Sequence, residues 1–312
     1  MRKLPLTEIL PFYRFIFERQ RVWHNRHILM HPSPWTQDEV LKKYKFCNTY
    51  RELDKGTIAI TNLIQNSNYS ASWKLFNIIA YRFFNKAESI SELFDGGLNP
   101  CKFSAEKFIE KADILHAQKA IFNDAYVVSP QVINPSYRPK SKHVQIAYML
   151  EDLVHQLPSL CENLGKKNGQ YMLEKFSDIP MVGSFLAGQI LLDCTYSTGE
   201  NGTPDLTSLT ANDFLIVGPG AHWGLNILWG QTLNKTDANS ACRYLFEMQK
   251  DAFNYINLQE NKNWETVRWQ NAKYHGGQFL ALHDIQNSLC EFRKHHRLTH
   301  EGAGRKRIFR NG

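Results

Sequence analysis

The sequence predicts an all-α fold, and two observations support this prediction. Apolar side chains recur at helical spacing along most of the 312 residues, as Ile9, Tyr13 and Ile16 do in the first predicted helix. Apolar residues make up 43% of the chain, which is ordinary for a globular protein with a buried core. No apolar run approaches the roughly 20 residues of a membrane span, and the first residues lack the apolar core of a signal peptide. We therefore expect a soluble intracellular protein with no membrane partner.

The N-terminal half is predicted to consist of helices separated by short breaks. The first helix, over residues 6–23, ends before the prolines Pro32 and Pro34. Thr36 is the predicted N-cap of the next helix, with Glu39 at the N3 position of a capping box. Further helices are predicted over residues 50–65, 71–85 and 104–122. The proline-containing stretch 123–142 is the predicted boundary between two helical lobes, 1–140 and 141–312, of a single unit spanning 1–312.

Two helices joined by a tight turn are predicted after a helix over residues 143–164. The segment 173–196 contains a helix, the turn sequence IPMVG and a second helix from Ser184. In a helix-hairpin-helix DNA-binding element, a glycine lets the backbone approach a phosphate, and the N–H groups at the start of the second helix bind it. This interpretation makes Val182, Gly183 and Ser184 contacts to the DNA backbone. The alternative is an ordinary helical hairpin with a glycine turn. The final third is predicted to be helical over residues 238–256, 264–269 and 281–296.

The charge of the chain indicates a polyanionic partner. The formal net charge is +7 and the pI is about 9.0, values that favour nucleic acid binding over a merely basic surface. Basic residues are dense near the C-terminus, from Arg293 and Lys294 to Arg310. This segment is interpreted either as following a phosphate backbone or as a solvated tail.

Cysteine and histidine usage gives no pattern typical of a metal site. The six cysteines are scattered singly, without a C-x-x-C pair. No H-E-x-x-H motif accompanies the histidines near either end. We expect no metal and no cofactor, and scattered thiols are typical of proteins in a reducing cytosol.

Asp213 follows the predicted helix-hairpin-helix element after a polar loop. This arrangement resembles the helix-hairpin-helix DNA glycosylase superfamily, in which an aspartate at this place faces the extruded base. Bifunctional members carry a nucleophilic lysine at a position that corresponds to Phe185, so no amine is placed for Schiff-base chemistry. The alternative role for Asp213 is a helix N-cap or loop carboxylate.

A glycine-rich segment, GPGAHWG, begins at Gly218 and is expected to open a helix. Such a turn presents N–H groups to phosphate or pyrophosphate through Gly218, Gly220, Ala221 and Gly224. It is not a Walker A loop, because no G-K-[ST] follows. The alternative is a tight turn that allows close helix packing.

The N-terminal segment that contains PWTQDEVLKKYKFCNTYRELD is dense in polar and aromatic residues. Trp35 is a candidate for stacking on a base. Arg26 and Arg51 are candidates for binding phosphates, and Asp38 and Asp54 for pairing with these arginines or for acid/base chemistry. The alternative is a buried ion-pair network that fastens two helices.

The same string resembles the helical domain associated with 5-hydroxymethyl-deoxyuridine DNA kinases and the related alpha-glutamyl/putrescinyl-thymine pyrophosphorylases. The family pattern is roughly P-W-T-x-D followed by a basic-Phe-x-Asn-x-x-Arg-x-x-Asp run. Two further blocks, residues 218–225 (GPGAHWGL) and 289–294 (LCEFRK), are similar to later parts of the family pattern. The matching residues of the first block are Pro34, Trp35, Thr36, Asp38, Phe46, Asn48, Arg51 and Asp54.

The resemblance implies a role in phage thymine hypermodification, in the cytoplasm of an infected bacterium. It implies a glycosylase-like helical fold with two lobes around a base-binding cleft. The chain lacks a P-loop, so the implied reaction is the transferase step rather than the kinase step. An amino acid or polyamine would displace pyrophosphate from 5-pyrophosphoryloxymethyl-uracil in double-stranded DNA, downstream of a DNA kinase, after the base is flipped out of the duplex.

The implied roles divide between acid/base and binding groups. The incoming amine must be neutral, so a carboxylate base is useful, and pyrophosphate leaves well if its charge is bound. Candidate bases are Asp213, Asp38 and Glu291. Candidate substrate- and pyrophosphate-binding residues are Arg26, Arg51, Asn48, Asp54, Gly218, Gly220, Ala221, Gly224 and Lys294.

Two other functions remain open from the sequence. One is a DNA glycosylase acting on a modified pyrimidine, and the other is a non-catalytic DNA-binding helper of a 5-hydroxymethyl-deoxyuridine DNA kinase. The sequence does not identify the transferred amine, the sequence context of the target base or the oligomeric state.

Overall fold

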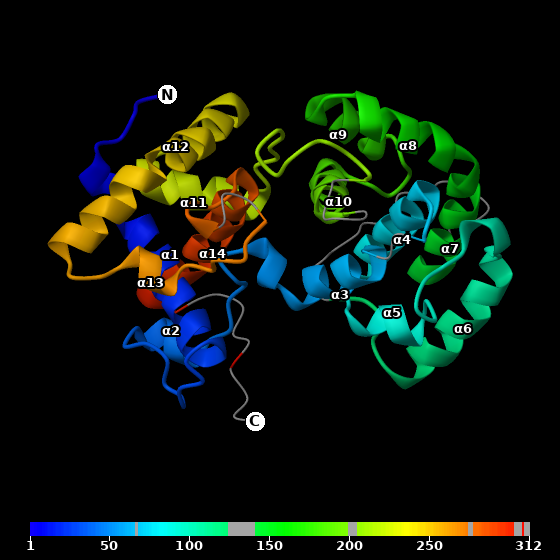
Figure 1. Cartoon of the computed structure of the whole chain (residues 1–312), viewed down its shortest axis with the longest axis horizontal. Coiled ribbons are helices and arrows are strands. Elements are labelled where there is room, and N and C mark those ends of the chain that lie inside the picture. Colours follow the sequence, from blue (N-terminus) through cyan, green and yellow to red (C-terminus); the bar gives the residue numbers. More distant parts are fainter. Residues whose placement is uncertain (66–67, 124–140, 199–204, 274–276, 303–307, 309–312) are drawn as a thin grey trace. The chain divides into compact units, whose positions relative to one another are not determined.

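The structure is a computed structural model that describes the chain except residues 66–67, 124–140, 199–204, 274–276, 303–307 and 309–312. The all-α prediction is confirmed for the described residues. Their regular elements are helices, apart from isolated bridge residues such as the antiparallel pair Tyr44 and Ile308 (Figure 1). No helix in this part of the chain combines the length and apolar character needed to cross a membrane.

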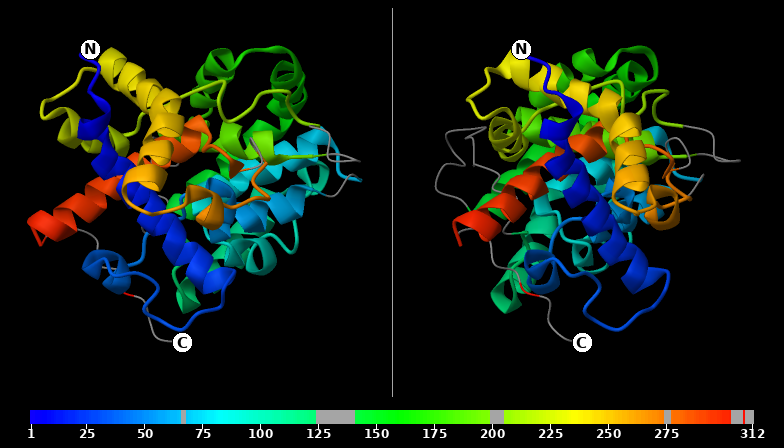
Figure 2. Two further views of the ribbon diagram at one scale, coloured as in Figure 1. Left: turned by 60° about the vertical axis from the view of Figure 1, so that its left-hand side comes forward. Right: turned by 90° about the vertical axis from the view of Figure 1, so that its left-hand side faces the viewer.

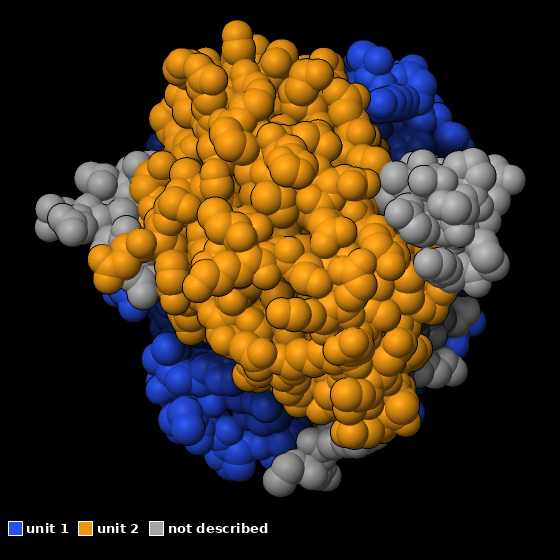
Figure 3. Space-filling model, turned by 90° about the vertical axis from the view of Figure 1, so that its right-hand side faces the viewer, with its two compact units in different colours: residues 1–54, 215–312 blue, residues 55–214 orange. Residues whose placement is uncertain are grey.

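The chain forms two compact units, coloured separately in Figure 3. Unit 1 comprises residues 1–54 and 215–312, and unit 2 comprises residues 55–214. These divisions differ from the expected lobes 1–140 and 141–312, because the first helix packs against helices from the C-terminal part of the chain. The predicted boundary, 123–142, lies almost wholly outside the described residues, as do Arg305, Lys306, Arg307 and Arg310 of the basic C-terminal segment.

Unit 1 is built around its N-terminal helix. In both views of Figure 2, α1 and α14 cross close to one another, and α1 also contacts α11, α12 and α13. Tyr13 of α1 donates a hydrogen bond to the carbonyl of Leu245, and Phe12 meets Phe292 edge-to-face at 5.7 Å. The elements of unit 1 are α1 (Leu6–His27), α2 (Glu39–Lys43), η1 (Arg51–Leu53), α11 (Pro219–Trp229), α12 (Lys235–Gln259), α13 (Trp264–Val267) and α14 (Leu282–His300).

Unit 2 surrounds a helix that is buried on nearly all sides. This helix, α4, is buried from Trp73 to Phe84 and contacts α3, α5, α7, α8 and α10. Most side chains of α4 are apolar, and a helix of this kind that is buried on all faces belongs in the centre of a domain. The elements of unit 2 are α3 (Lys55–Ile64), α4 (Ala71–Phe84), α5 (Glu88–Glu92), η2 (Pro100–Lys102), α6 (Ala105–Gln118), α7 (Lys142–Leu153), η4 (Val154–Gln156), α8 (Leu157–Lys166), α9 (Gly169–Ser177) and α10 (Ser184–Tyr196).

Two cations of α4 are buried in the core of unit 2, and each has a carboxylate partner. Arg82 makes two hydrogen bonds of 2.5 Å to the carboxylate of Asp193 on α10, and both side chains are at most 2% exposed. Lys74, 1% exposed, pairs with Asp205, which also accepts a hydrogen bond from Ser197. Buried charges of this kind persist because they are paired and hydrogen-bonded.

The start of α2 differs from the prediction. Asp38, not Thr36, is the N-cap, and its carboxylate accepts hydrogen bonds from the N–H groups of Val40 and Leu41. The Thr36 hydroxyl instead accepts a hydrogen bond from the Asp38 N–H and donates one to Glu18 of α1. The capping-box prediction was wrong because the Thr36 hydroxyl hydrogen-bonds to Glu18 of α1 and Asp38 caps the helix instead.

The two helices and the turn of the predicted helix-hairpin-helix element are present as α9, a turn and α10, and DNA binding by this element stays a prediction. The left-handed residue of the turn is Met181, with φ +67°, whereas Gly183 is extended at φ −79° and serves as N-cap of α10. A Cβ added at Gly183 would meet nothing within 4 Å, and Gly183 and Ser184 are exposed while Val182 is buried. Glycine is therefore not required by the local backbone, although the start of α10 is uncovered.

Candidate functional site: a polar network along α14

The three sequence blocks singled out above meet at α14 within unit 1. The first block reaches α14 through hydrogen bonds from the backbone N–H of Arg51 to Asp284 and of Cys47 to Glu291. The second block forms α11, which packs along the same helix. The third block is part of α14 itself. Polar side chains gather at this junction, and we call them the α14 network: Arg19, Asn48, Arg51, Glu52, Asp54, Asp284, Asn287 and Glu291.

Arg19 joins α1 to the first block. Its Nε donates to the carbonyl of Cys47 at 2.8 Å, and one Nη donates to the carbonyl of Phe46 at 3.1 Å and to Oδ1 of Asn48 at 2.7 Å. The side chain is only 7% exposed, and burial lowers the pKa of this guanidinium, although Asp54 and Glu291 oppose the shift. Arg19 thus fixes the backbone that carries Asn48.

Arg51 and Asp54 form the charged centre of the network. Arg51 Nη1 donates to Asp54 Oδ2 at 2.6 Å and to Oδ1 of Asn287 at 3.4 Å. The other Asp54 oxygen accepts the backbone N–H of Asn48 at 2.9 Å. Arg51 is 7% exposed and Asp54 is partly exposed, so the predicted pairing of these two residues exists as a largely buried ion pair.

Two carboxyl groups of the network have pKa values raised to between about 7 and about 8. Burial raises the pKa of Asp284 to about 7, against the effect of hydrogen bonds from the backbone N–H groups of Arg51 and Ala281. Burial and the nearby Asp284 raise the pKa of Glu52 to about 8, although Glu52 accepts the N–H of Lys273 at 3.0 and 3.1 Å. Carboxyl groups shifted in this way are suited to proton transfer near pH 7.

The middle of α14 binds the loop between α2 and η1. Glu291 accepts the backbone N–H of Cys47 at 3.0 Å, and Lys294 donates to the carbonyl of Lys45 and lies 4.2 Å from the centroid of the Phe46 ring. His295 is 2.8 Å from the carboxylate of Asp38. Burial would raise the pKa of Asp38, but the hydrogen bonds from His295, Leu41 and Val40 outweigh it and lower the pKa. Asp38 is therefore held as an anion.

The glycines of the second block lie where α11 approaches α14. A Cβ at Gly220 would lie 2.3 Å from Sγ of Cys290, and one at Gly224 would lie 2.3 Å from the carbonyl oxygen of Leu289. Ala221, between them, is also buried. Gly218 is the extended N-cap of α11, at φ −71°. Close helix packing accounts for the glycines at 220 and 224, whereas phosphate binding at the start of α11 stays a prediction.

Arg26 and Trp35 lie together at the end of α1. The Arg26 guanidinium lies 5.0 Å from the centroid of the Trp35 ring, and Arg26 is exposed. Trp35 is half-buried against the core of unit 1, its Nε1 donates to the carbonyl of His31, and its own carbonyl accepts from Asn25. The tryptophan is thus held by α1 and the following loop, and its stacking on a base stays a prediction.

Asp213 and the segment 182–184 belong to unit 2, whereas the α14 network belongs to unit 1. Asp213 is exposed and accepts hydrogen bonds from the N–H and the hydroxyl of Thr210 at 2.6 and 2.9 Å. This contact matches the role of a loop carboxylate. Its role opposite an extruded base stays a prediction.

Sequence reasoning missed Arg19, Glu52, Asp284 and Asn287. Arg19 had a detectable signal, because it stands on the apolar face of α1 next to the buried residues Ile16 and Phe17. Asp284 resembled an ordinary first-turn acid of a helix, and the hydrogen bond that its carboxylate accepts from the Arg51 N–H joins residues far apart in the sequence. In the described residues, no group of three or more His, Cys, Asp or Glu side chains is arranged to hold a metal ion.

Comparison with known proteins identifies the family. A family profile described as "5-hmdU DNA kinase, helical domain" matches residues 7–305. A protein named 5-hmdU DNA kinase from Bacillus phage SP10 is 29% identical over 226 residues, which are 69% of this chain and 35% of the relative. The chain therefore spans about one third of the length of that relative. No solved structure is significantly similar, so the expected helix-hairpin-helix glycosylase fold is not confirmed. The chain belongs to the family of 5-hmdU DNA kinase helical domains, among the phage thymine-hypermodification proteins.

Proposed function

We propose that this chain transfers an amine onto 5-pyrophosphoryloxymethyl-uracil in DNA, with the α14 network as its proton-handling centre. The observation that carries the proposal is the pair of carboxyl groups, Glu52 and Asp284, whose pKa values lie at about 8 and about 7. Glu52 belongs to the first family block, and Asp284 at the start of α14 accepts the backbone N–H of Arg51 in the same block. The proposed place of action is the cytoplasm of the infected host, where the phage DNA is modified.

The reaction requires a base near neutral pH. The nitrogen of an amino acid or polyamine attacks the methylene carbon, the bond from this carbon to the pyrophosphate oxygen breaks, and pyrophosphate leaves with the electron pair. The nitrogen loses a proton, which passes to a carboxylate. A base works best when its pKa is close to the operating pH, and Glu52 meets this condition. Asp38 is a weaker base, because its pKa is lowered.

Binding of the leaving pyrophosphate requires positive charge. Arg26 is exposed beside Trp35 and is suited to this role. Arg51 is largely buried and already paired with Asp54, so we assign it to holding Asp54 and Asn287 in place. Asp213 and Glu291 remain candidate carboxylates for the same reaction.

The direct test is transfer on a defined duplex. Purified protein is incubated with DNA that carries 5-pyrophosphoryloxymethyl-uracil and a mixture of amino acids and polyamines, and the DNA is digested to nucleosides for mass spectrometry. We expect a nucleoside heavier than thymidine by one amine residue, together with free pyrophosphate. An unchanged base without pyrophosphate release would contradict the proposal, and base loss would indicate a glycosylase instead.

Variants connect the reaction to the network. Glu52→Gln should lower the transfer rate by about 10²- to 10⁴-fold, the typical contribution of a general base. Glu162→Gln, on the exposed face of α8, is the matched control and should leave the rate unchanged. If Glu52→Gln retains the full rate and Asp213→Asn abolishes transfer, the base lies in unit 2 and the assignment to the α14 network is wrong.

A second candidate function is a non-catalytic DNA-binding helper of a 5-hmdU DNA kinase. It is favoured by the name of the phage SP10 relative and by the matched share of that protein, about one third. In this case the chain should stimulate phosphorylation of 5-hydroxymethyl-uracil DNA by a kinase without forming a new nucleoside. Asp213→Asn and Glu52→Gln should leave this stimulation intact.

A further inference from the structure

We propose that the outer face of α11, together with the middle of α14, binds an unpaired base of a DNA strand and the phosphate beside it. The inference rests on the proposed function only in taking DNA as the ligand. Its residues are distinct from the α14 network, and one of them, Arg293, begins the basic segment for which the sequence left a phosphate-binding role open. The stacking residue is Trp223, and the phosphate-binding residue is Arg293.

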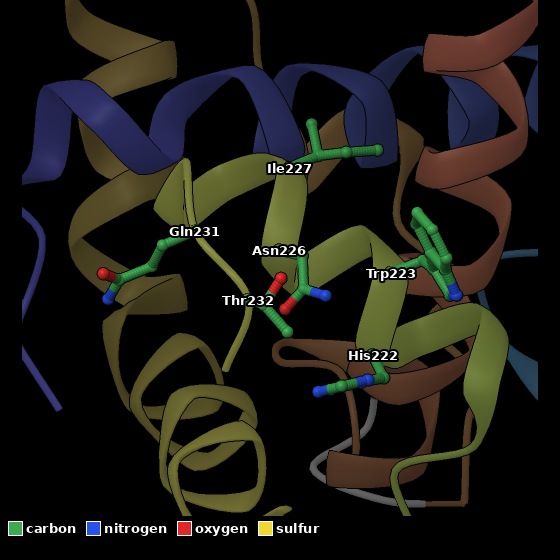
Figure 4. Close-up of a pocket in the computed structure, with 6 residues that line it drawn as sticks. All are labelled: His222, Trp223, Asn226, Ile227, Gln231 and Thr232. Atoms are coloured by element: carbon green, nitrogen blue, oxygen red, sulfur yellow. The ribbon is translucent and has the colours of Figure 1, made fainter. Parts of the chain in front are cut away.

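Trp223 is an exposed aromatic ring at the edge of a hollow. The hollow has a volume of about 430 Å³ and lies on the outer face of α11 and the turn that follows it (Figure 4). Trp223 is 58% exposed, whereas the buried face of α11 holds Ala221, Gly224 and Leu225. A large ring left in solvent by its own helix is available to stack on a ligand, and base–aromatic stacking accepts any nucleobase.

The polar groups of the hollow complement the edge of a base. His222 Nε2 lies 2.7 Å from the carbonyl of Leu233 and must donate to it, so Nδ1 of the neutral ring is left as an acceptor. Asn226 accepts the N–H of Leu233 through Oδ1, which directs its Nδ2 donor away from that contact. Both side chains line the same hollow as Trp223, and in Figure 4 the His222 ring extends to the side of α11 away from the indole. A hollow that offers a donor, an acceptor and a stacking ring matches what a base requires.

Arg293 places an unneutralised cation beside the ring. Its guanidinium lies 5.5 Å from the centroid of Trp223, and no carboxylate among the described residues pairs with it. Basic residues continue along α14 in the sequence RKHHR, residues 293–297, in which His295 is paired with Asp38. Arg297, one turn further on the same face, pairs with Glu301 at the surface. An arginine stacked on an exposed tryptophan, at the head of a basic row, fits a phosphate followed by a base.

The choice of DNA over an apolar peptide follows from this charge. The hollow has an aromatic edge and amide groups, and its neighbouring helix segment is cationic, so a polyanion with planar bases fits better than an apolar chain. The net charge of +7 acts in the same direction.

The test is binding of a fluorescein-labelled oligothymidylate, measured by fluorescence anisotropy over a series of salt concentrations. Trp223→Ala should weaken binding by about tenfold or more, since stacking of one base is lost. Arg293→Gln should weaken binding and reduce the slope of log K against log salt by about 0.7. Two exposed residues of unit 1 serve as controls: Leu258→Ala on α12 and Arg2→Gln, which is paired with Glu8, should bind like the wild type.

Binding of a strand of abasic residues distinguishes base stacking by Trp223 from phosphate binding by Arg293. On this strand Trp223→Ala should bind like the wild type, whereas Arg293→Gln should still be weaker. Equal binding of oligothymidylate by wild type and Trp223→Ala would overturn the inference, as would a marked preference for oligouridylate RNA. The assay contains neither modified base nor amine. A wild type that binds through Trp223 but forms no new nucleoside therefore contradicts the proposed function alone, and transfer with unaltered Trp223→Ala binding contradicts this inference alone.

Discussion

Both units bury charged groups, but they balance them differently. In unit 2, Arg82 and Asp193 form a closed pair in which one cation meets one carboxylate through two hydrogen bonds. In unit 1, the carboxyl groups of the α14 network outnumber its guanidinium groups, and Glu52 and Asp284 hold raised pKa values as a result of burial. A matched pair can only hold a fold together, whereas surplus carboxyl groups also provide sites that take up and release protons.

The largest expected effect is on the matched pair. Asp193→Asn leaves the Arg82 guanidinium buried without an anion, which should lower the free energy of unfolding by about 3–5 kcal/mol. Urea unfolding followed by circular dichroism measures the total loss, and hydrogen exchange with mass spectrometry assigns it to peptides of residues 55–214. A loss below about 1 kcal/mol would mean that this pair contributes little to unit 2.

Close packing of α11 on α14 gives the next effect, in unit 1. Gly224→Ala places a Cβ 2.3 Å from the carbonyl oxygen of Leu289, which is backbone and cannot move aside without shifting a helix. We expect a loss of about 1–3 kcal/mol in the free energy of unfolding, with increased exchange in α11 and α14. Gly165→Ala in α8 is the control, since a Cβ there meets nothing within 4 Å, and it should be neutral or slightly stabilising. Equal effects of the two substitutions would contradict the packing role of Gly224.

The surplus carboxyl groups should make unit 1 sensitive to pH. A carboxyl whose pKa is higher in the folded than in the unfolded protein stabilises the fold at low pH, and this stabilisation is lost as the pH rises through the folded value. For Asp284 and Glu52 the loss should occur from about pH 4 to about pH 8. Glu52→Gln mimics the protonated form and should exceed the wild type in stability by about 1–2 kcal/mol at pH 9, with little difference at pH 4.5.

Unfolding measured at several pH values checks this prediction. A wild type whose stability rises steadily from pH 5 to pH 8 would contradict the raised pKa values. If Glu52→Gln shows the same pH dependence as the wild type, the sensitivity arises from Asp284 or from other groups.

The smallest effect should come from an ion pair at the surface of unit 2. Lys166 and Glu162 are 2.7 Å apart on α8, and both are exposed to water. Lys166→Gln should leave the midpoint of urea unfolding unchanged within error, because exposed pairs are screened by solvent. A clear shift of the midpoint would show that an ion pair in this protein does not need to be buried to contribute to stability.

Helix positions were largely predictable from the sequence, because their apolar periodicity is local. The predicted helices 71–85 and 104–122 correspond to α4 (Ala71–Phe84) and α6 (Ala105–Gln118). The grouping of helices into units was not predictable, since periodicity shows which face of α1 is buried but not that α12 and α14 cover it. The Thr36 N-cap failed for a related reason, namely a tertiary contact with Glu18.

The candidate site was predictable in part. The first block led to Asn48, Arg51 and Asp54, which do lie together and share hydrogen bonds. Asp284 and Glu52 were not found, because a raised pKa depends on burial, which a single carboxylate in a sequence does not reveal. Trp223 was not predicted, because the glycines of the same block indicate the face of α11 that packs on α14, and the sequence does not show that Trp223 is exposed.

The discontinuity of unit 1 has a consequence for the order in which the protein folds during synthesis. Residues 1–54 are synthesised before unit 2, but the partners of α1 in α12 and α14 are synthesised after it. The apolar face of α1, with Phe12, Tyr13 and Ile16, must wait without its native partners while residues 55–214 are translated. Unit 2, which is continuous, is able to fold first. A released fragment of residues 1–214 should therefore display a protected unit 2 and a protease-sensitive N-terminal segment.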